Sequence, residues 1–280
     1  MTSINIEKIT PYIGVKISGV DLSSDLNLND LNHIYELLIK HKVIFFHNQI
    51  ISSNSHLNFA KSFGAIEPPH PVYPSVKDFP DIVMLENGKN NPPDTDVWHT
   101  DLTFKANPPF ASILYSKVVP SFGGDTLWSS LTEIYDSLPI HIQNYLLELY
   151  AVHDMGDFRN TFTLNEKIGN ATELNEAFVK FGNSIHPVIK EHPISKKKLL
   201  YINPSFTSHI VGLNSSDSRN LLNYLFNFMN KPEFQLRFKW EKNVIAMWDN
   251  RSTMHYAVGD YMPHHRLMHR VTIINDKRNI

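Results

Sequence analysis

Five side chains carry the chemistry that this sequence suggests. His99 and Asp101 lie two residues apart, and His255 follows far downstream, with Arg266 and Arg270 shortly after it. Two imidazoles and one carboxylate can hold a metal ion on one face and leave its other positions open, which is the ligand set of non-haem Fe(II) oxygenases. In such a site the two arginines would hold anionic co-substrates.

The spacing of His99 and Asp101 suits a shared ligand. In an extended segment, residues two apart point to the same face, so both side chains reach one ion while Trp98 and Leu102 face the core. The sequence predicts that residues 244–248 form a strand and 249–251 a turn, so that His255 returns opposite this pair. Because the chain holds 15 histidines, a hydrogen-bonded surface pair stays open as an alternative.

Arg266 and Arg270 precede a β-branched run that favours a strand, which would place both guanidinium groups on one face, about 13 Å apart at roughly 3.3 Å per residue. Guanidinium groups match carboxylate and sulfonate geometry and stay charged at any working pH. This spacing allows two different anions to be bound. The alternative is a pair of surface arginines in salt bridges.

Composition sets the class of protein. With 280 residues, 42% hydrophobic and 19% charged, the chain can bury a sizeable core. We expect one domain over residues 1–280. The net charge of -2 gives no electrostatic footprint for nucleic acid.

The chain has no cysteine, which excludes disulfides, thiolate nucleophiles and iron-sulfur clusters. Any metal must therefore be held by His, Asp or Glu. The first residues lack the apolar core of a signal peptide, and no apolar run approaches about 20 residues, so we expect a soluble cytoplasmic protein that does not enter a membrane.

Local patterns predict helices over residues 29–41, capped by Asn29 or Asp30, over Ser55–Phe63, and over Asp217–Asn230. Residues 130–133 have the spacing of a capping box. The predicted strands are Val43–Phe46, Ala111–Val119, Leu199–Ile202, Val244–Trp248 and Arg270–Ile274. Strands dispersed among few helices indicate a mainly β fold with flanking helices, either a sandwich or a jelly roll.

Ordered blocks along nearly the whole chain resemble the TauD/TfdA family of Fe(II)/2-oxoglutarate-dependent dioxygenases, and within it the taurine dioxygenase group. These blocks are Pro11–Gly14, Ile17–Asp21, His70–Pro74, Asn91–Asp94, Trp98–Phe104, Gly123–Trp128, Lys231–Gln235 and Trp248–Arg270. The resemblance implies a double-stranded β-helix, or jelly roll, with His99, Asp101 and His255 as iron ligands. It also implies 2-oxoglutarate and O2 as co-substrates, with the distal carboxylate of 2-oxoglutarate bound by Thr126 and Arg266.

The same resemblance implies taurine as the substrate. Hydroxylation at the carbon bearing sulfur would release sulfite and aminoacetaldehyde, while 2-oxoglutarate gives succinate and CO2. Arg270 and His70 would bind the sulfonate, and the remaining pocket positions are Tyr73, Thr95, Leu102, Phe104 and Phe206.

Two departures put the substrate in question. Thr95 stands where the family has an asparagine and offers fewer hydrogen bonds, and the loop over residues 154–162 carries an extra stretch. Another small sulfonate, a sulfate ester or an amino acid therefore stays open as substrate.

Alternatives from other classes also stay open. Two histidines and an aspartate could hold catalytic zinc in a hydrolase, although no His-Glu-x-x-His motif supplies a base and a hydrolase has no evident need for Thr126 with Arg266. A non-enzymatic β-sandwich binding module is the third reading. The family resemblance further implies a homo-oligomer, a dimer or tetramer.

Overall fold

The computed structural model describes residues 4–69, 73–93, 97–155 and 182–278. Its largest sheet has eight strands in the order β1-β2-β3-β14-β6-β16-β5-β4. In that order the strands are Asn5–Lys8, Val15–Ser18, Val43–Phe46, Ile245–Asp249, Ala111–Val118, Arg266–Ile273, Phe79–Asn87 and Ser75–Val76. Every neighbouring pair is antiparallel except β2 and β3.

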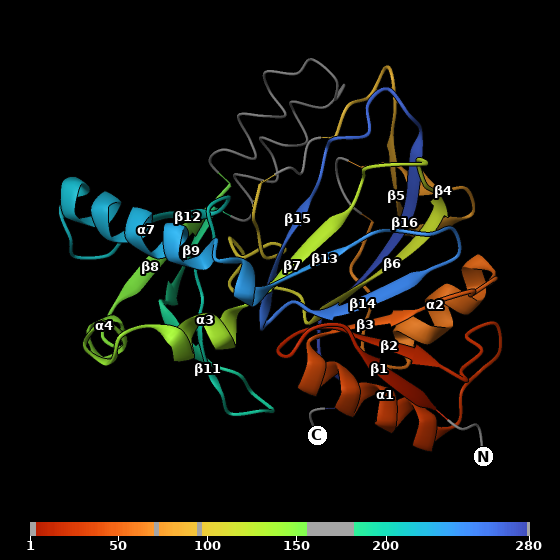
Figure 1. Cartoon of the computed structure of the whole chain (residues 1–280), viewed down its shortest axis with the longest axis horizontal. Coiled ribbons are helices and arrows are strands. Elements are labelled where there is room, and N and C mark those ends of the chain that lie inside the picture. The colour runs from red at the N-terminus through yellow and green to blue at the C-terminus, as the bar shows by residue number, and fades with distance from the viewer. Residues whose placement is uncertain (1–3, 70–72, 94–96, 156–181, 279–280) are drawn as a thin grey trace.

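A second antiparallel sheet, β13-β7-β15, lies over one face of the first (Figure 1). Its strands are β13 (Gln235–Phe238), β7 (Thr126–Ser130) and β15 (Thr253–Ala257). Large side chains fill the space between the sheets, among them Trp128, Trp248 and Met268. The two packed sheets, antiparallel apart from the β2–β3 pair, form the jelly roll that the family resemblance implies.

Strand β3 shows why an unbroken apolar run belongs here. Val43 and Phe45 enter the core between the two sheets, whereas Ile44 and Phe46 enter a second core on the opposite face. All four residues are fully buried. A strand covered on both faces needs apolar side chains at every position rather than at alternate ones.

Helices α1 (Leu28–His41) and α2 (Ser53–Lys61) cover the outer face of the eight-stranded sheet (Figure 1). Both predicted helices are confirmed, but the cap of α1 lies upstream of the predicted Asn29 or Asp30. The Asn27 side chain accepts a hydrogen bond from Asp30 N–H, and the Ser52 side chain accepts one from Ser55 N–H. Each cap satisfies a backbone donor that the first helical turn leaves free.

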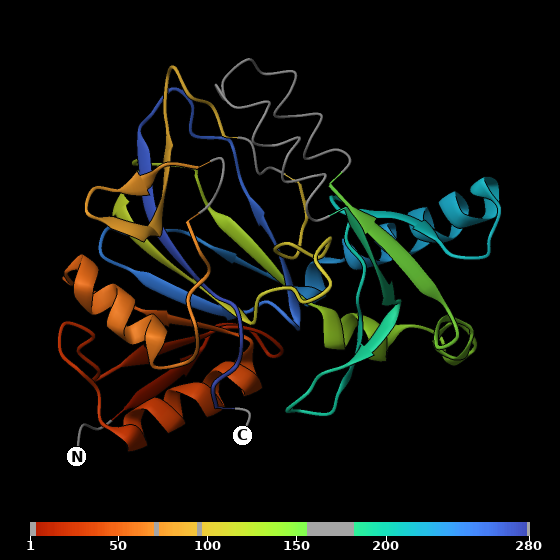
Figure 2. The same cartoon turned by 180° about the vertical axis from the view of Figure 1, so that it is seen from behind.

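A smaller unit lies at the other end of the molecule (Figure 2). It contains the sheet β12-β8-β9, with β12 (Thr207–Ile210), β8 (Tyr150–Asp154) and β9 (Asn183–Pro187), and the hairpin β10 (Ile189–Glu191) with β11 (Lys198–Leu200). Its helices are α3 (Leu131–Ser137), α4 (Ile140–Leu146), α7 (Ser215–Met229) and the 3-10 turn η1 (Pro232–Phe234). These elements share their own apolar core.

The predicted capping box at residues 130–133 is wrong in its hydrogen bonds. Ser130 precedes α3, but its hydroxyl donates to the Glu133 carboxylate and caps no backbone N–H. Lys42 explains the difference, because its Nζ lies 3.1 Å from Glu133 Oε2 and holds that carboxylate in an ion pair.

Among the described residues, no helix has the length and apolar character that spanning a membrane requires.

Candidate metal centre and co-substrate site

A backbone bridge brings the two candidate histidine ligands together. His255 lies in the middle of β15, and His99 pairs with it in an isolated antiparallel bridge. The His99 N–H donates to the His255 carbonyl at 2.9 Å, and the reverse bond is 2.7 Å long. Directly opposed residues project their side chains to the same face, and the two imidazole centroids lie 4.1 Å apart.

Asp101 completes the cluster. Its Oδ1 lies 3.8 Å from His99 Nε2 and 3.8 Å from His255 Nε2, and all three ligand atoms lie within 4.8 Å of one another. Among the described residues, this is the one group of three His, Cys, Asp or Glu side chains whose geometry could hold a metal ion. Three ligands on one side leave the opposite side open.

The segment that carries Asp101 differs from the predicted strand. His99 forms the isolated bridge, but residues 101–104 form a turn, and Leu102 has a φ of 55°. A side chain other than glycine rarely adopts this left-handed conformation, and such strain is found mainly where the surroundings require it. Leu102 lines a narrow pocket with Asp101 and Arg270 rather than facing the core. The turn therefore positions both the candidate ligand Asp101 and the side chain of Leu102, which forms part of the pocket wall.

The charge states of the ligands suit a metal. Burial raises the pKa of Asp101, but His255, Arg270 and other neighbours lower it to about 2. Burial together with His99 lowers the pKa of His255 to about 3, so its ring is neutral near pH 7. His99 Nδ1 lies 2.8 Å from the Val97 carbonyl, and a proton donated there leaves the lone pair on Nε2. The site thus offers one carboxylate and one neutral imidazole, with His99 Nε2 directed at the same centre.

Arg266 lies on β16 with its side chain almost completely buried, 5% exposed. Among the described residues, no carboxylate oxygen lies within 4.0 Å of the Arg266 guanidinium nitrogens. The Nε atom of Arg266 also has no hydrogen-bond partner. Its aliphatic chain packs close to Gly124, where an added Cβ would come within 3.3 Å of Arg266 Cδ. Gly124 precedes Thr126 by two residues, so the arginine lies beside the start of β7.

Thr126 is also buried, 3% exposed, at the first position of β7. Trp240 Nε1 lies 2.9 Å from Thr126 Oγ1. An indole N–H can only donate, so the threonine oxygen accepts this bond and its own proton must point elsewhere. Among the described residues that proton has no acceptor. A buried cation and a free hydroxyl donor together suit a carboxylate.

Arg270 lies four residues further along β16, with Nη1 3.7 Å from Asp101 Oδ1. Its side chain is 15% exposed and its Nε has no partner. Phe104 and Phe206 pack edge to face with ring centroids 5.2 Å apart, and Phe206 lies 6.4 Å from the His99 ring. The candidate metal centre is thereby bordered by a cation and by an aromatic pair.

Unpaired buried donors provide a test of whether anionic ligands fit. Arg266 Nε, Arg270 Nε and Trp248 Nε1 are buried and lack hydrogen-bond partners. Most buried polar atoms in folded proteins are paired, so an unpaired group calls for an explanation. Two unpaired guanidinium donors on one strand, of which Arg270 reaches Asp101 of the His, Asp, His cluster, fit a metal ion with anionic co-substrates.

The structure brings part of the predicted site together. His99, Asp101 and His255 form one cluster, which Leu102, Arg270, Phe206 and Phe104 border. Thr126 begins β7, and Arg266 packs beside the start of that strand. Tyr73 is half-buried just before β4. His70, Thr95 and residues 156–162 of the divergent loop lie outside the described residues.

Three residues that contact this site were not predicted: Ser112, Trp240 and Asn250. Ser112 and Asn250 hydrogen-bond to Asp101, and Trp240 to Thr126. Asn250 lies within the resembling block Trp248–Arg270, but Ser112 occupies a strand whose pattern indicated burial alone. Such contacts depend on long-range pairing that local patterns do not reveal.

Comparison with known proteins agrees with this geometry. Residues 5–272 match the family model described as taurine catabolism dioxygenase TauD, TfdA family. The chain is 34% identical to an alkylsulfatase of Acinetobacter baylyi, over 98% of this chain and 86% of that protein. It is also 34% identical to an alpha-ketoglutarate-dependent sulfate ester dioxygenase of Pseudomonas putida, over 98% and 90%.

A crystal structure of a taurine dioxygenase from Burkholderia xenovorans superimposes with a TM-score of 0.83 at 31% identity, covering 98% of this chain and 90% of that one. Dependence on Fe(II) and 2-oxoglutarate is characteristic of the matched family, and the His, Asp, His cluster is present here. The chain therefore belongs to the TauD/TfdA family of Fe(II)- and 2-oxoglutarate-dependent dioxygenases.

Proposed function

We propose that this dioxygenase hydroxylates a small organosulfur anion, a sulfonate or a sulfate ester, at the carbon next to the sulfur-containing group. The observation that carries the proposal is Arg270, whose guanidinium reaches 3.7 Å from Asp101 Oδ1 and keeps an unpaired Nε. A permanent cation beside the metal centre would hold a sulfonate or sulfate with its neighbouring carbon close to the metal. The named relatives act on substrates of this class.

In this proposal His99, Asp101 and His255 hold Fe(II). Bound iron with 2-oxoglutarate supplies the oxidising chemistry, in which 2-oxoglutarate and O2 yield succinate, CO2 and a hydroxylated substrate. The zinc hydrolase considered from the sequence loses its support, because the family depends on Fe(II) and 2-oxoglutarate. The protein contributes position and electrostatics rather than an acid or a base.

Arg266 and Thr126 would bind the distal carboxylate of 2-oxoglutarate. The arginine supplies a buried positive charge, and the threonine supplies the hydroxyl proton that Trp240 leaves free. A charge-assisted hydrogen bond in a dry site is stronger than the same bond in water. Trp240 would therefore orient the Thr126 hydroxyl for this carboxylate.

Arg270 would bind the substrate anion with His70, and Phe104 with Phe206 would exclude water from the reacting carbon. Leu102, placed by its left-handed turn, would form the wall between the metal ligand and Arg270. Tyr73 and Thr95 complete the predicted pocket. The single-domain organisation and the homo-oligomeric state stay predictions beside these roles.

Within this class, two substrates are favoured by different observations. The residue pattern of the taurine dioxygenase group favours taurine, whose hydroxylated product would collapse to sulfite and aminoacetaldehyde. The two relatives at 34% identity favour alkyl sulfate esters, whose hydroxylated product would collapse to sulfate and an aldehyde. Thr95 in place of an asparagine weakens the case for the amine of taurine, because threonine offers fewer hydrogen bonds.

Succinate release with Fe(II), O2 and 2-oxoglutarate tests the proposal against a panel of taurine, a longer alkyl sulfonate, a medium-chain alkyl sulfate and a phenoxyacetate. We expect the sulfur anions to accelerate succinate release, with sulfite formed from sulfonates or sulfate from the ester. Acceleration by the phenoxyacetate alone would overturn the organosulfur assignment. The ratio of turnover between taurine and the alkyl sulfate decides the substrate within the class.

A further inference from the structure

The Asn250 carboxamide binds the chain on both sides of the Asp101 α-carbon. Its Oδ1 accepts from the Asp101 N–H at 2.9 Å, and its Nδ2 donates to the Asp101 carbonyl at 3.0 Å. The same Nδ2 donates to the Pro109 carbonyl at 3.1 Å. Asn250 is 1% exposed, so water cannot replace these bonds. One amide thereby fixes the backbone from which the candidate carboxylate ligand projects.

Ser112 fixes the carboxylate itself. This residue lies on β6, is fully buried, and donates from Oγ to Asp101 Oδ2 at 3.0 Å. Because the hydroxyl occupies Oδ2, the other oxygen, Oδ1, faces His99 and His255 at 3.8 Å from each Nε2. Asp101 therefore presents one oxygen to the centre of the cluster and keeps the second away from it.

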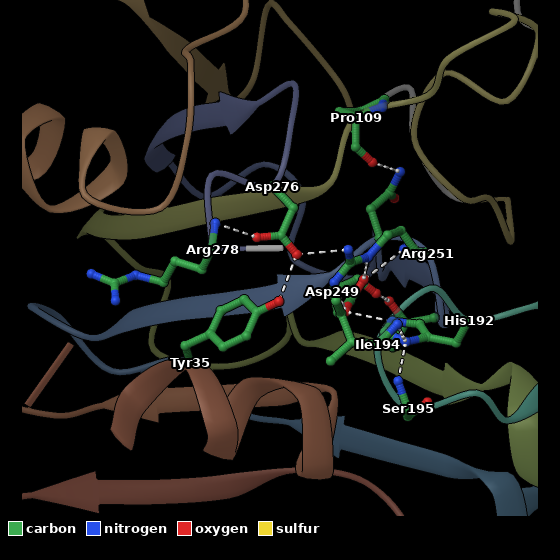
Figure 3. Close-up of polar contacts among 11 residues, drawn as sticks. Tyr35, Pro109, His192, Ile194, Ser195, Asp249, Arg251, Asp276 and Arg278 are labelled. Atoms are coloured by element: carbon green, nitrogen blue, oxygen red, sulfur yellow. Dashed lines mark hydrogen bonds and ion pairs between the residues drawn. The ribbon is translucent and has the colours of Figure 1, made fainter. Parts of the chain in front are cut away.

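The two residues that flank Asn250 in the chain, Asp249 and Arg251, belong to a buried ionic network (Figure 3). Asp249 is fully buried and lies 2.9 Å from His192 Nε2 and 2.8 Å from Arg251 Nη2. Arg251 Nη1 also contacts Asp276 Oδ2 at 2.8 Å, which ties the turn after β14 to the C-terminal segment. The turn that presents the carboxamide is thus fixed from both sides.

We infer that Asn250 and Ser112 are positioning residues that hold Asp101 as a ligand through one oxygen. This inference rests on the proposed function of the cluster as the metal site. A carboxylate free to rotate could bind through both oxygens and fill a position that the co-substrates need. Residues that orient metal ligands in this way typically change metal affinity by about 10- to 100-fold when they are replaced.

Binding of Mn(II) to the metal-free protein, measured by the EPR signal of free Mn(II), tests the inference without turnover. Ser112→Ala and Asn250→Ala should each weaken Mn(II) binding by roughly 10- to 100-fold. Ser116→Ala is the matched control, because Ser116 is a fully buried serine on the same strand that donates to the Glu241 and Val244 carbonyls. It should keep the wild-type affinity even where it lowers the melting temperature.

The outcomes separate the two proposals. If the wild-type protein binds no Mn(II), the metal site itself is wrong. If the wild type binds Mn(II) and folded Ser112→Ala binds it as tightly as Ser116→Ala does, the positioning inference is wrong. Asn250→Ala removes three buried hydrogen bonds, and should it fail to fold, Ser112→Ala decides the question alone.

Discussion

Replacing Arg266 with methionine should change stability and co-substrate binding in opposite directions. Burial lowers the pKa of Arg266, although Tyr261 and Asp125 act in the opposite direction. Asp125 is itself bound by Arg237, at 2.6 Å between Nε and Oδ2. The protein without 2-oxoglutarate therefore carries a buried cation with an unpaired Nε, and such a group costs about 1–3 kcal/mol.

Methionine keeps much of the side-chain volume and removes this charge. The free energy of unfolding without ligand should rise by about 1–3 kcal/mol. Loss of one partner of a buried charge pair costs about 3–5 kcal/mol, so the Kd for 2-oxoglutarate should rise roughly 150- to 4000-fold. Wild-type protein at about 100 times its Kd gains about 2.7 kcal/mol from the ligand, and the variant should lose nearly all of that gain.

Urea unfolding of the Mn(II) protein, with and without 2-oxoglutarate, measures both effects in one assay. Arg219→Met on the exposed face of α7 is the control, and it should raise neither stability nor Kd. Wild-type affinity for 2-oxoglutarate in Arg266→Met would refute the assigned role. A variant that is less stable than the wild type without ligand would refute the argument that a buried cation with an unpaired Nε costs stability.

Three further results are expected. Arg270→Ala should lower kcat/KM for the organosulfur substrate at least ~30-fold, from about 2 kcal/mol of lost charge pairing, and leave the Kd for 2-oxoglutarate unchanged; equal losses for both ligands would contradict separate roles. Trp240→Phe removes the donor to Thr126 Oγ1 and should raise the 2-oxoglutarate Kd about fivefold, for about 1 kcal/mol, without changing Mn(II) affinity; an unchanged Kd would show that Thr126 needs no orientation. Burial lowers the pKa of His56 to about 3. Between this value and the pKa of about 6.5 in the unfolded chain, His56 is protonated only in the unfolded state. The free energy of unfolding therefore falls as pH falls through this range. His56→Leu should therefore remove about 1.4 kcal/mol of the stability difference between pH 7.5 and about pH 5.5. Replacing the exposed His33 with glutamine is the control and should leave this difference unchanged. An unaltered difference in His56→Leu would contradict a neutral buried imidazole at this position.

Periodicity was sufficient to predict the helices α1, α2 and α7 and several buried strands, among them β3, β6 and β14. The apolar spacing of residues 31–39 predicts α1, and the run at 43–46 predicts β3, because each pattern is set by burial of the element itself. The strands β1 and β9 were not predicted. All four β1 residues are exposed, and β9 mixes exposed and buried positions, so neither carries a clear alternation. Their pairing depends on partners distant in sequence.

For the site, residue types predicted the ligand set, and the resemblance to a family predicted the roles of the arginines. The convergence of His99 with His255 required a bridge between segments 156 residues apart, which no local pattern encodes. The turn at Leu102 was also not predicted. An extended segment was the simplest conformation for residues 98–102, but the distant residue Asn250 holds the Asp101 backbone in a turn.

The most direct test of the account is the visible spectrum of the protein with Fe(II) and 2-oxoglutarate under anaerobic conditions. We predict a weak charge-transfer band, because both groups would bind together at His99, Asp101 and His255. Asp101→Ala and His255→Ala should each abolish the band while remaining folded. A colourless mixture with folded wild-type protein, or a band that survives both substitutions, would contradict the assignment of these three residues as the iron site.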